Sequence, residues 1–240
     1  MKQLAGLIFA LAVAVMPARA QTPVALELVL LADATGSIDE AEIRFQREGY
    51  AEAITHPDVL DAISFTGPIA VTYIEWADSL SQHVVADWAV IEGEASAEAF
   101  ASALLKPPRE AFGRNAIGAA LLFGKSQIEG NDFDGARRVI DLSADSANNW
   151  NGPPIEDARD EVVAAGITIN GLAVLCRGCS GRPISYDLEE AFEEQIVGGP
   201  GAFVVTADSA ETFSIAVRRK LILEISGVEK PKRYVLQGTE

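Results

Sequence analysis

Residues 30–42 read LLADATGSIDEAE and contain the features that decide the predicted fold. An apolar run ends at Asp33, and Thr35 and Ser37 follow at intervals of two residues around Gly36. The acidic segment after them favours a helix. We interpret this stretch as a buried strand, a polar loop and a helix. In open α/β sheets, ligands bind at the carboxyl ends of the strands, where Asp33 would lie.

Strand and helix patterns alternate along the rest of the chain, which predicts one α/β domain with a doubly wound, mainly parallel central sheet and helices on both faces. Residues 81–91 follow the strand 69–77 after a short turn, so we expect an antiparallel partner at the sheet edge. The other predicted strands are 24–32, 136–144, 167–175 and 201–207, and the predicted helices are 38–54, 96–106, a segment from about residue 114, 154–166, 187–197 and 209–225.

The first 20 residues have the pattern of a secretory signal: a basic start, an apolar stretch and a small-residue end at Ala18-Arg19-Ala20. We expect cleavage near Ala20, which leaves a domain at 21–228 and an irregular tail at 229–240 in a periplasmic or secreted protein. A retained N-terminal anchor is the alternative. No later segment approaches the apolar length of a transmembrane helix.

The chain is acidic, with 35 Asp and Glu residues against 19 Lys and Arg and a formal net charge of −16. Loss of Lys2 and Arg19 with the signal leaves 17 basic residues, so the mature charge is about −18. This argues against nucleic acid or an anionic membrane as a partner. The acidic residues are scattered, as on an ordinary solvated surface.

Cys176 and Cys179 are the two cysteines, and they are spaced as C-R-G-C. A local disulfide is the expected state in an oxidising compartment. A redox pair would open a helix, whereas the following SGRP favours a loop. A metal site would need further ligands, and His56 and His83 are the only histidines.

Two further segments bring polar side chains to the predicted strand ends. GRNAIGAAL (113–121) contains Asn115, and DLSADSANNWNG (141–152) contains Asp145, Asn148 and Asn149. Oxygen ligands without sulfur or imidazole suit a hard divalent cation such as Mg²⁺. Each side chain also has a simpler interpretation: Asp33 and Ser37 as caps of the following helix, Asn115 as the cap of its own helix, and Asp145 in an Asx-turn.

The chain resembles a von Willebrand factor type A (vWA) domain, and more narrowly a bacterial branch of exported vWA-like proteins of unknown function. The resemblance covers nearly the whole mature chain. It is carried by LLADATGSIDEAEIRFQREGYAEAI, IAVTYIEWAD, GRNAIGAAL, RRVIDLSADSANN and VGGPGAFVVTADSAETFSIAVRRKLILEI. It implies a mainly parallel sheet with one antiparallel edge strand.

The resemblance also implies a metal-ion-dependent adhesion site (MIDAS). In that site Asp33 and Ser37 match an Asp and a Ser of the Asp-x-Ser-x-Ser motif, Thr35 stands at its other Ser, and Asp145 matches the Asp of the third loop. Asn115 stands where the family has Thr, which puts the high-affinity ligand-bound state in question more than metal binding itself.

These features predict a non-enzymatic domain that binds a protein through Mg²⁺, Mn²⁺ or Ca²⁺, with the partner supplying an Asp or Glu carboxylate. Trp150, beside Asn148 and Asn149 in the loop after Asp145, is a candidate partner contact, and loop packing is its alternative role. A metal-independent scaffold with a degenerate site is the competing hypothesis, and a metal-assisted hydrolase is the third. The sequence does not identify the oligomeric state.

Overall fold

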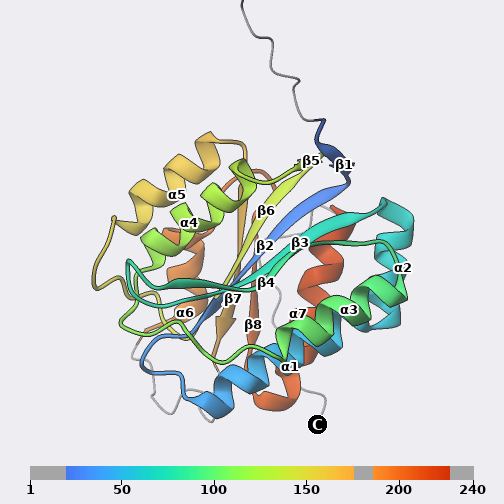
Figure 1. Ribbon diagram of the computed structural model, residues 1–240. Coiled ribbons are helices and arrows are strands. Elements are labelled where there is room, and N and C mark those ends of the chain that lie inside the picture. The colour runs from blue at the N-terminus through green and yellow to red at the C-terminus, as the bar shows by residue number, and fades with distance from the viewer. Residues whose placement is uncertain (1–19, 176–185, 228–240) are drawn as a thin grey trace, which may run out of the picture.

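The computed structural model describes residues 20–175 and 186–227. Its centre is a six-stranded sheet in the order β4-β3-β2-β6-β7-β8, in which all neighbouring pairs are parallel except β3 and β4 (Figure 1). The strands are β2 (Leu26–Asp33), β3 (Ile69–Trp76), β4 (Gln82–Ile91), β6 (Arg138–Ala144), β7 (Thr168–Val174) and β8 (Val204–Ala207). The predicted fold class is confirmed, with β4 as the antiparallel edge strand.

Burial on both faces explains why the central strands are continuous apolar runs. All eight residues of β2 are buried, and so are all eight of β3. Side chains of β2 alternate between two cores: Leu28 and Leu30 pack on one side of the sheet, whereas Val29 and Leu31 pack on the other. A short parallel pair, β1 (Thr22–Val24) with β5 (Phe133–Gly135), lies beside the amino ends of the central strands.

Helices cover both faces of the sheet (Figure 1). One layer contains α1 (Glu40–Thr55), α2 (Pro57–Thr66), α3 (Glu94–Leu104) and α7 (Ala210–Ser226), in which α1 packs against α3 and α7. The other layer contains α4 (Ile117–Glu129), α5 (Ile155–Ala164), α6 (Leu188–Ala191) and the π-helical turn η1 (Phe192–Ile196). Each layer therefore closes one of the two cores.

Helix α2 is absent from the sequence prediction, in which the first helix ends at residue 54 and no helix follows before the strand 69–77. The structure places Pro57 at the first position of α2, where its missing N–H costs no hydrogen bond. His56 caps this helix, since its Nδ1 accepts a hydrogen bond from the Asp58 N–H at 3.2 Å. The predicted helix 187–197 is likewise two pieces, α6 and η1.

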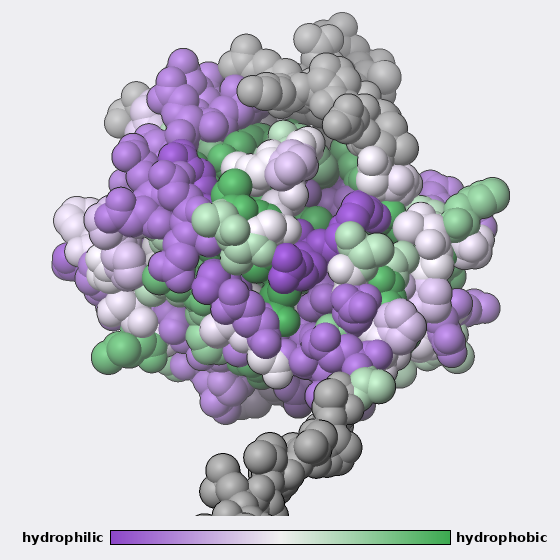
Figure 2. Space-filling model, turned by 90° about the horizontal axis from the view of Figure 1, so that it is seen from above, coloured by the Kyte–Doolittle hydropathy of each residue, from purple (hydrophilic) through white to green (hydrophobic). Residues whose placement is uncertain are grey.

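The two ends of the sheet differ in character. Figure 2 views the end at which the parallel strands begin, and hydrophilic and hydrophobic residues are interspersed there. The opposite end, where β2 and β6 finish, holds the candidate site. In the part of the chain that the structure describes, no helix combines the length and apolar character that a bilayer span requires. Cys176 and Cys179, and so the predicted disulfide, lie outside the described residues.

Candidate metal centre

The loop after β2 turns the side chains of Asp33, Thr35 and Ser37 toward one another. Asp33 is the last residue of β2 and is buried, and its Oδ1 accepts a hydrogen bond from the Thr35 N–H at 2.8 Å. The hydroxyl oxygens of Thr35 and Ser37 are 3.1 Å apart. A carboxylate and two hydroxyls therefore lie within one short turn.

Asp145 and Asn115 join this group from two other loops. Asp145 follows β6, the parallel neighbour of β2, and its charge acts directly on Asp33. Asn115 precedes α4, is buried, and donates from Nδ2 to the Ser146 hydroxyl at 3.1 Å. Because the amide nitrogen is used in this way, the amide oxygen is the atom of Asn115 that is suited to face a cation.

Burial and a neighbouring carboxylate disturb the ionisation of Asp33. Removal from water and, after it, the Asp145 charge raise the pKa of Asp33 from 3.8 to about 7, although hydrogen bonds from Thr35 and from the Asp145 main chain act in the opposite direction. Oδ2 of Asp33 is buried and has no hydrogen bond of good geometry among the described residues. A cation beside Asp33 would relieve both the desolvation and the repulsion.

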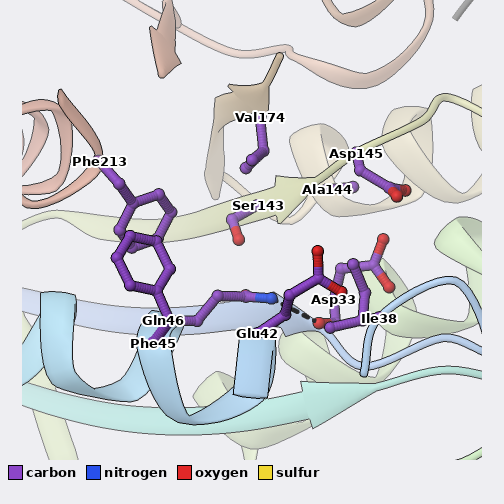
Figure 3. A pocket seen from close by; sticks show the side chains of 10 residues that line it. All are labelled: Asp33, Ile38, Glu42, Phe45, Gln46, Ser143, Ala144, Asp145, Val174 and Phe213. Atoms are coloured by element: carbon purple, nitrogen blue, oxygen red, sulfur yellow. Dashed lines mark hydrogen bonds between the residues drawn. The ribbon is translucent and has the colours of Figure 1, made fainter. Parts of the chain in front are cut away.

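A small cavity of about 10 Å³ adjoins Asp33 on the side of α1 and α7 (Figure 3). Glu42, Ser143 and Asp145 contribute its polar lining, and Phe45 and Phe213 contribute apolar walls. The space is close to the minimum for one water molecule. Burial raises the pKa of Glu42, the hydrogen bond from the Asp39 main chain lowers it, and the charges of Asp39 and Asp145 raise it. Thr35, Ser37 and Asn115 do not line this cavity.

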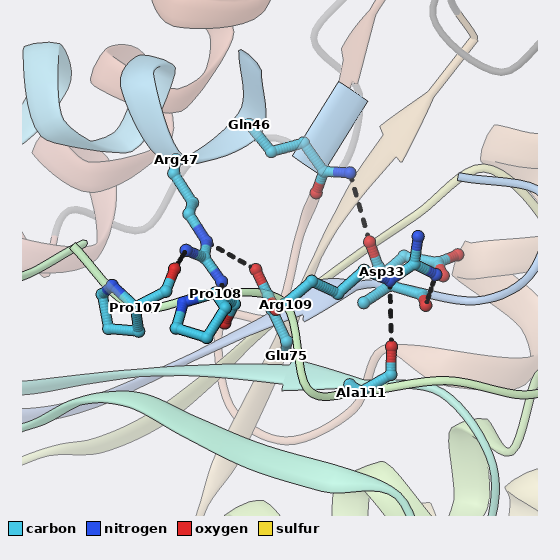
Figure 4. A network of polar contacts seen from close by, with 9 residues as sticks. Asp33, Gln46, Arg47, Glu75, Pro107, Pro108, Arg109 and Ala111 are labelled. Atoms are coloured by element: carbon cyan, nitrogen blue, oxygen red, sulfur yellow. Dashed lines mark hydrogen bonds and ion pairs between the residues drawn. The ribbon is translucent and has the colours of Figure 1, made fainter. Parts of the chain in front are cut away.

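Arg109 holds the main chain of the site loop in place. Its Nη2 donates to the carbonyl oxygens of Ala34 and Thr35 at 2.6 and 3.1 Å, and its Nη1 donates to that of Ile38 at 2.8 Å. Its Nε donates to the Ala111 carbonyl at 3.0 Å (Figure 4). Three carbonyls of one loop thus converge on a single guanidinium, which fixes the curvature of that loop.

A buried ion pair supports the segment that carries Arg109. Arg47 on α1 pairs with Glu75 on β3 at 2.7 Å and donates to the Pro107 carbonyl at 2.5 Å (Figure 4). The neighbouring Gln46 donates from Nε2 to the Asp33 carbonyl at 3.2 Å. Helix α1 therefore fixes the end of β2 directly and the Arg109 segment through Arg47.

Helix capping does not account for Asp33, Ser37 or Asn115. The N-cap of α1 is Asp39, whose Oδ1 accepts from the main-chain N–H groups of Ala41 and Glu42 at 2.8 and 2.9 Å. The N-cap of α4 is Ala116, without a side-chain bond. The polar side chains before both helices are thus available for another role.

The loop after Asp145 presents Trp150 to solvent beside the site. Trp150 is 64% exposed, and the Arg114 guanidinium lies 5.2 Å from its ring centroid. Asn148 is also exposed. Asn149 instead holds the loop, because its Oδ1 accepts from the Gly118 N–H and its Nδ2 donates to the Pro153 carbonyl.

The donor set fits a hard divalent cation held by few charges. Within the described part of the chain, no three side chains of His, Cys, Asp or Glu come together as a metal site. A cation here would therefore depend on the carboxylates of Asp33 and Asp145, the hydroxyls of Thr35 and Ser37, the amide oxygen of Asn115 and water. Mg²⁺ accepts such a mixed oxygen set and keeps water ligands.

Solved structures share this fold at low sequence identity. The pilus adhesin SpaC from Lactobacillus rhamnosus GG superposes with a TM-score of 0.60 at 11% identity, over 85% of this chain and 30% of that one. Proximal thread matrix protein 1 from the mussel byssus, with a zinc-occupied MIDAS motif, has a TM-score of 0.60 at 15% identity, over 86% of this chain and 49% of that one. The vWF domain of the pili tip protein Mfa5 from Porphyromonas gingivalis has a TM-score of 0.56 at 8% identity, over 88% of this chain and 98% of that one.

This chain spans less than half of the SpaC and byssus chains, so those matches concern one domain of each. Comparison with curated protein sequences finds no match. Residues 23–229 match the family described as "Protein of unknown function (DUF1194)". Because this match spans most of the sequence, the chain belongs to that family, and its fold is that of a vWA-like domain.

Proposed function

We propose that this protein is an exported, non-enzymatic interaction domain that binds a protein partner through a divalent cation. Asp33, Thr35, Ser37, Asn115 and Asp145 hold the cation, with Mg²⁺ as the expected ion and Mn²⁺ or Ca²⁺ as substitutes. The observation that carries this proposal is the buried Oδ2 of Asp33, which has no well-formed hydrogen bond and lies next to a second carboxylate.

The partner supplies an Asp or Glu side chain in this proposal. Two protein carboxylates balance the charge of a divalent ion, and the neutral protein oxygens do not fill its coordination shell, so water ligands remain that an incoming carboxylate can replace. The exposed Trp150 and Asn148 lie beside the site and form the first contacts. The pilus adhesin and the zinc-bound byssus protein have the same fold, which supports an interaction role.

Relaxation of water protons by bound Mn²⁺ tests the proposal. We expect the metal-stripped chain to bind Mn²⁺ with an enhanced relaxation signal, and a short Glu-containing peptide to lower that signal by displacing water. The same peptide with Gln is the matched ligand control. Metal binding without any effect of the Glu peptide would contradict the role of the partner carboxylate. Absence of Mn²⁺ binding would favour the scaffold with a degenerate site.

A further inference from the structure

Lys220 is a charged residue with no exposed surface. It lies on the inner face of α7, and its side chain is 0% exposed. A lysine is almost never fully buried unless it is paired. The groups that contact the Lys220 amine therefore determine how its burial is compensated and which reactions are open to it.

Two carboxyl groups contact the amine from different elements. Nζ of Lys220 lies 2.7 Å from Oδ1 of Asp141 on β6 and 2.5 Å from Oε1 of Glu224, one turn along α7. Asp141 and Glu224 are 1% and 2% exposed. The carboxyl carbon of Asp141 is one C–O bond away from Oδ1. The distance from Nζ to this carbon therefore exceeds 2.7 Å by no more than that bond length, which brings it near the separation of about 3–3.5 Å at which groups react.

The walls of this cluster are aromatic and otherwise hydrogen-bonded. The Lys220 amine lies 5.6 Å from the centroid of the Phe203 ring. Asn170 donates from Nδ2 to Glu224 Oε1 at 2.9 Å and accepts from the Phe203 N–H at 3.2 Å. The cluster thus has one amine and two carboxyls, all three of them buried.

We propose that Lys220 and Asp141 form an intramolecular amide bond that covalently joins α7 to β6, with Glu224 as the proton carrier. The neutral amine of Lys220 adds to the carboxyl carbon of protonated Asp141. The N–C bond forms, one C–O bond breaks, and the hydroxyl leaves as water. Glu224 takes the proton from Nζ and returns it to the leaving hydroxyl, so the reaction needs neither oxidant nor reductant.

The environment of Asp141 favours the protonated carboxyl that this step needs. Burial and, to a smaller extent, the Glu224 charge raise the pKa of Asp141 from 3.8 to about 7, although the Lys220 ammonium acts in the opposite direction. One ammonium and two carboxylates carry the same net charge as a neutral amine, a protonated carboxyl and one carboxylate. Proton transfer within the cluster therefore gives the reactive set without bringing any further charge into the interior. Proximity then replaces an intermolecular condensation by a step within one molecule.

Peptide mapping of the purified full chain tests the bond directly. Trypsin should release a linked pair of peptides, 139–159 and 220–232, because an acylated Lys220 is not cleaved and Lys230 precedes Pro231. The pair should be lighter than the sum of its peptides by one water. Wild-type protein that yields only the separate peptides would overturn the proposal and leave an ion pair. A link from Lys220 to Asn170, with loss of ammonia, would also overturn it.

The same digest contains an internal control. Lys125 also contacts two carboxylates, Glu129 at 3.0 Å and Glu161 at 3.3 Å, but these acids are about half exposed to water. We expect no link at Lys125, since water has access to both of these carboxylates. Links at both lysines would show that sample handling, and not the buried site, produces the bond.

Glu224→Gln separates the reaction from the mere proximity of the reactants. This variant keeps Lys220 and Asp141 but removes the proton carrier, so linking should slow about 10²- to 10⁴-fold, the usual contribution of a general acid or base. Lys220→Arg keeps a cation and should abolish the link. Wild-type mapping tests the proposal even where a variant does not fold. A fully linked and folded Glu224→Gln would remove Glu224 from the mechanism.

Discussion

At Asp33, burial and the nearby Asp145 carboxylate both disfavour the ionised form of the side chain. Its pKa is raised to about 7 from 3.8 by desolvation and by Asp145. A group with a raised folded-state pKa stabilises the fold below its unfolded pKa, and that contribution is lost as pH rises through the folded pKa. The metal-free protein should therefore lose stability between about pH 4 and pH 7.

Asp33→Asn tests this effect. The variant is neutral and similar in shape, so without metal it should be more stable than wild type at pH 8 and should lack the Asp33 part of the pH dependence. We expect a wild-type loss on the order of 2–4 kcal/mol between pH 4 and 8 relative to the variant. Urea unfolding in EDTA across this range measures the difference. Parallel curves for the two proteins would contradict the raised pKa.

Arg109 is a site residue that the sequence did not reveal. An arginine in a Pro-Pro-Arg-Glu stretch looks like an ordinary solvated loop residue, and no spacing links it to residues 34–38. Only the folded chain brings its guanidinium to three carbonyls of the site loop. Lys220 was missed for a related reason, because one charge in an amphipathic helix pattern does not reveal that it is buried.

Arg109→Gln should loosen the site loop. We expect a loss of about 1–3 kcal/mol of folding free energy from the unpaired carbonyls, and metal binding weaker by at least about tenfold. Arg44→Gln, at an exposed position of α1, carries the same charge change and should leave both quantities unchanged. Chemical unfolding and metal titration of the two variants give the comparison. Equal metal affinity in both would exclude a positioning role for Arg109.

Whole elements were predicted well where their pattern was long and periodic. The predicted strands 24–32 and 69–77 and the predicted helix 209–225 agree with β2, β3 and α7 of the structure. The proximity of the loops after β2 and β6 was also predictable, because these neighbouring parallel strands end at one edge of the sheet. Helix α2 was not, since proline both ends and begins helices and the sequence alone does not separate these roles.

Helix α4 approaches the loop after β6 so closely that Gly118 has no room for a side chain. A Cβ there would collide with the Pro153 carbonyl oxygen, which is main chain and cannot rotate away. Gly118→Ala should destabilise the fold by about 1–3 kcal/mol and displace the loop. Gly124→Ala in the same helix meets only side-chain ends of Ile140 and Leu31 at 3.1 and 3.3 Å and should be milder. Thermal melts of both variants check this order.

On the scale of the whole molecule, the negative net charge of the chain favours the binding of a cation. The chain carries a net charge of −16, and two of its carboxylates share one buried corner at the end of the sheet. The Arg47–Glu75 pair, Arg109 and Gln46 all support that corner from the α1 side (Figure 4). These contacts therefore hold this corner of the sheet in place.

Calorimetric titration of the metal-stripped protein with Mg²⁺, beside Asp33→Ala and the exposed control Asp160→Asn, tests the central claim most directly. We predict saturable binding by wild type and by Asp160→Asn, no binding by Asp33→Ala, and a stabilisation of about 2.7 kcal/mol at a hundredfold excess over Kd. No binding by wild type, or undiminished binding by Asp33→Ala, would contradict a metal centre at the end of β2.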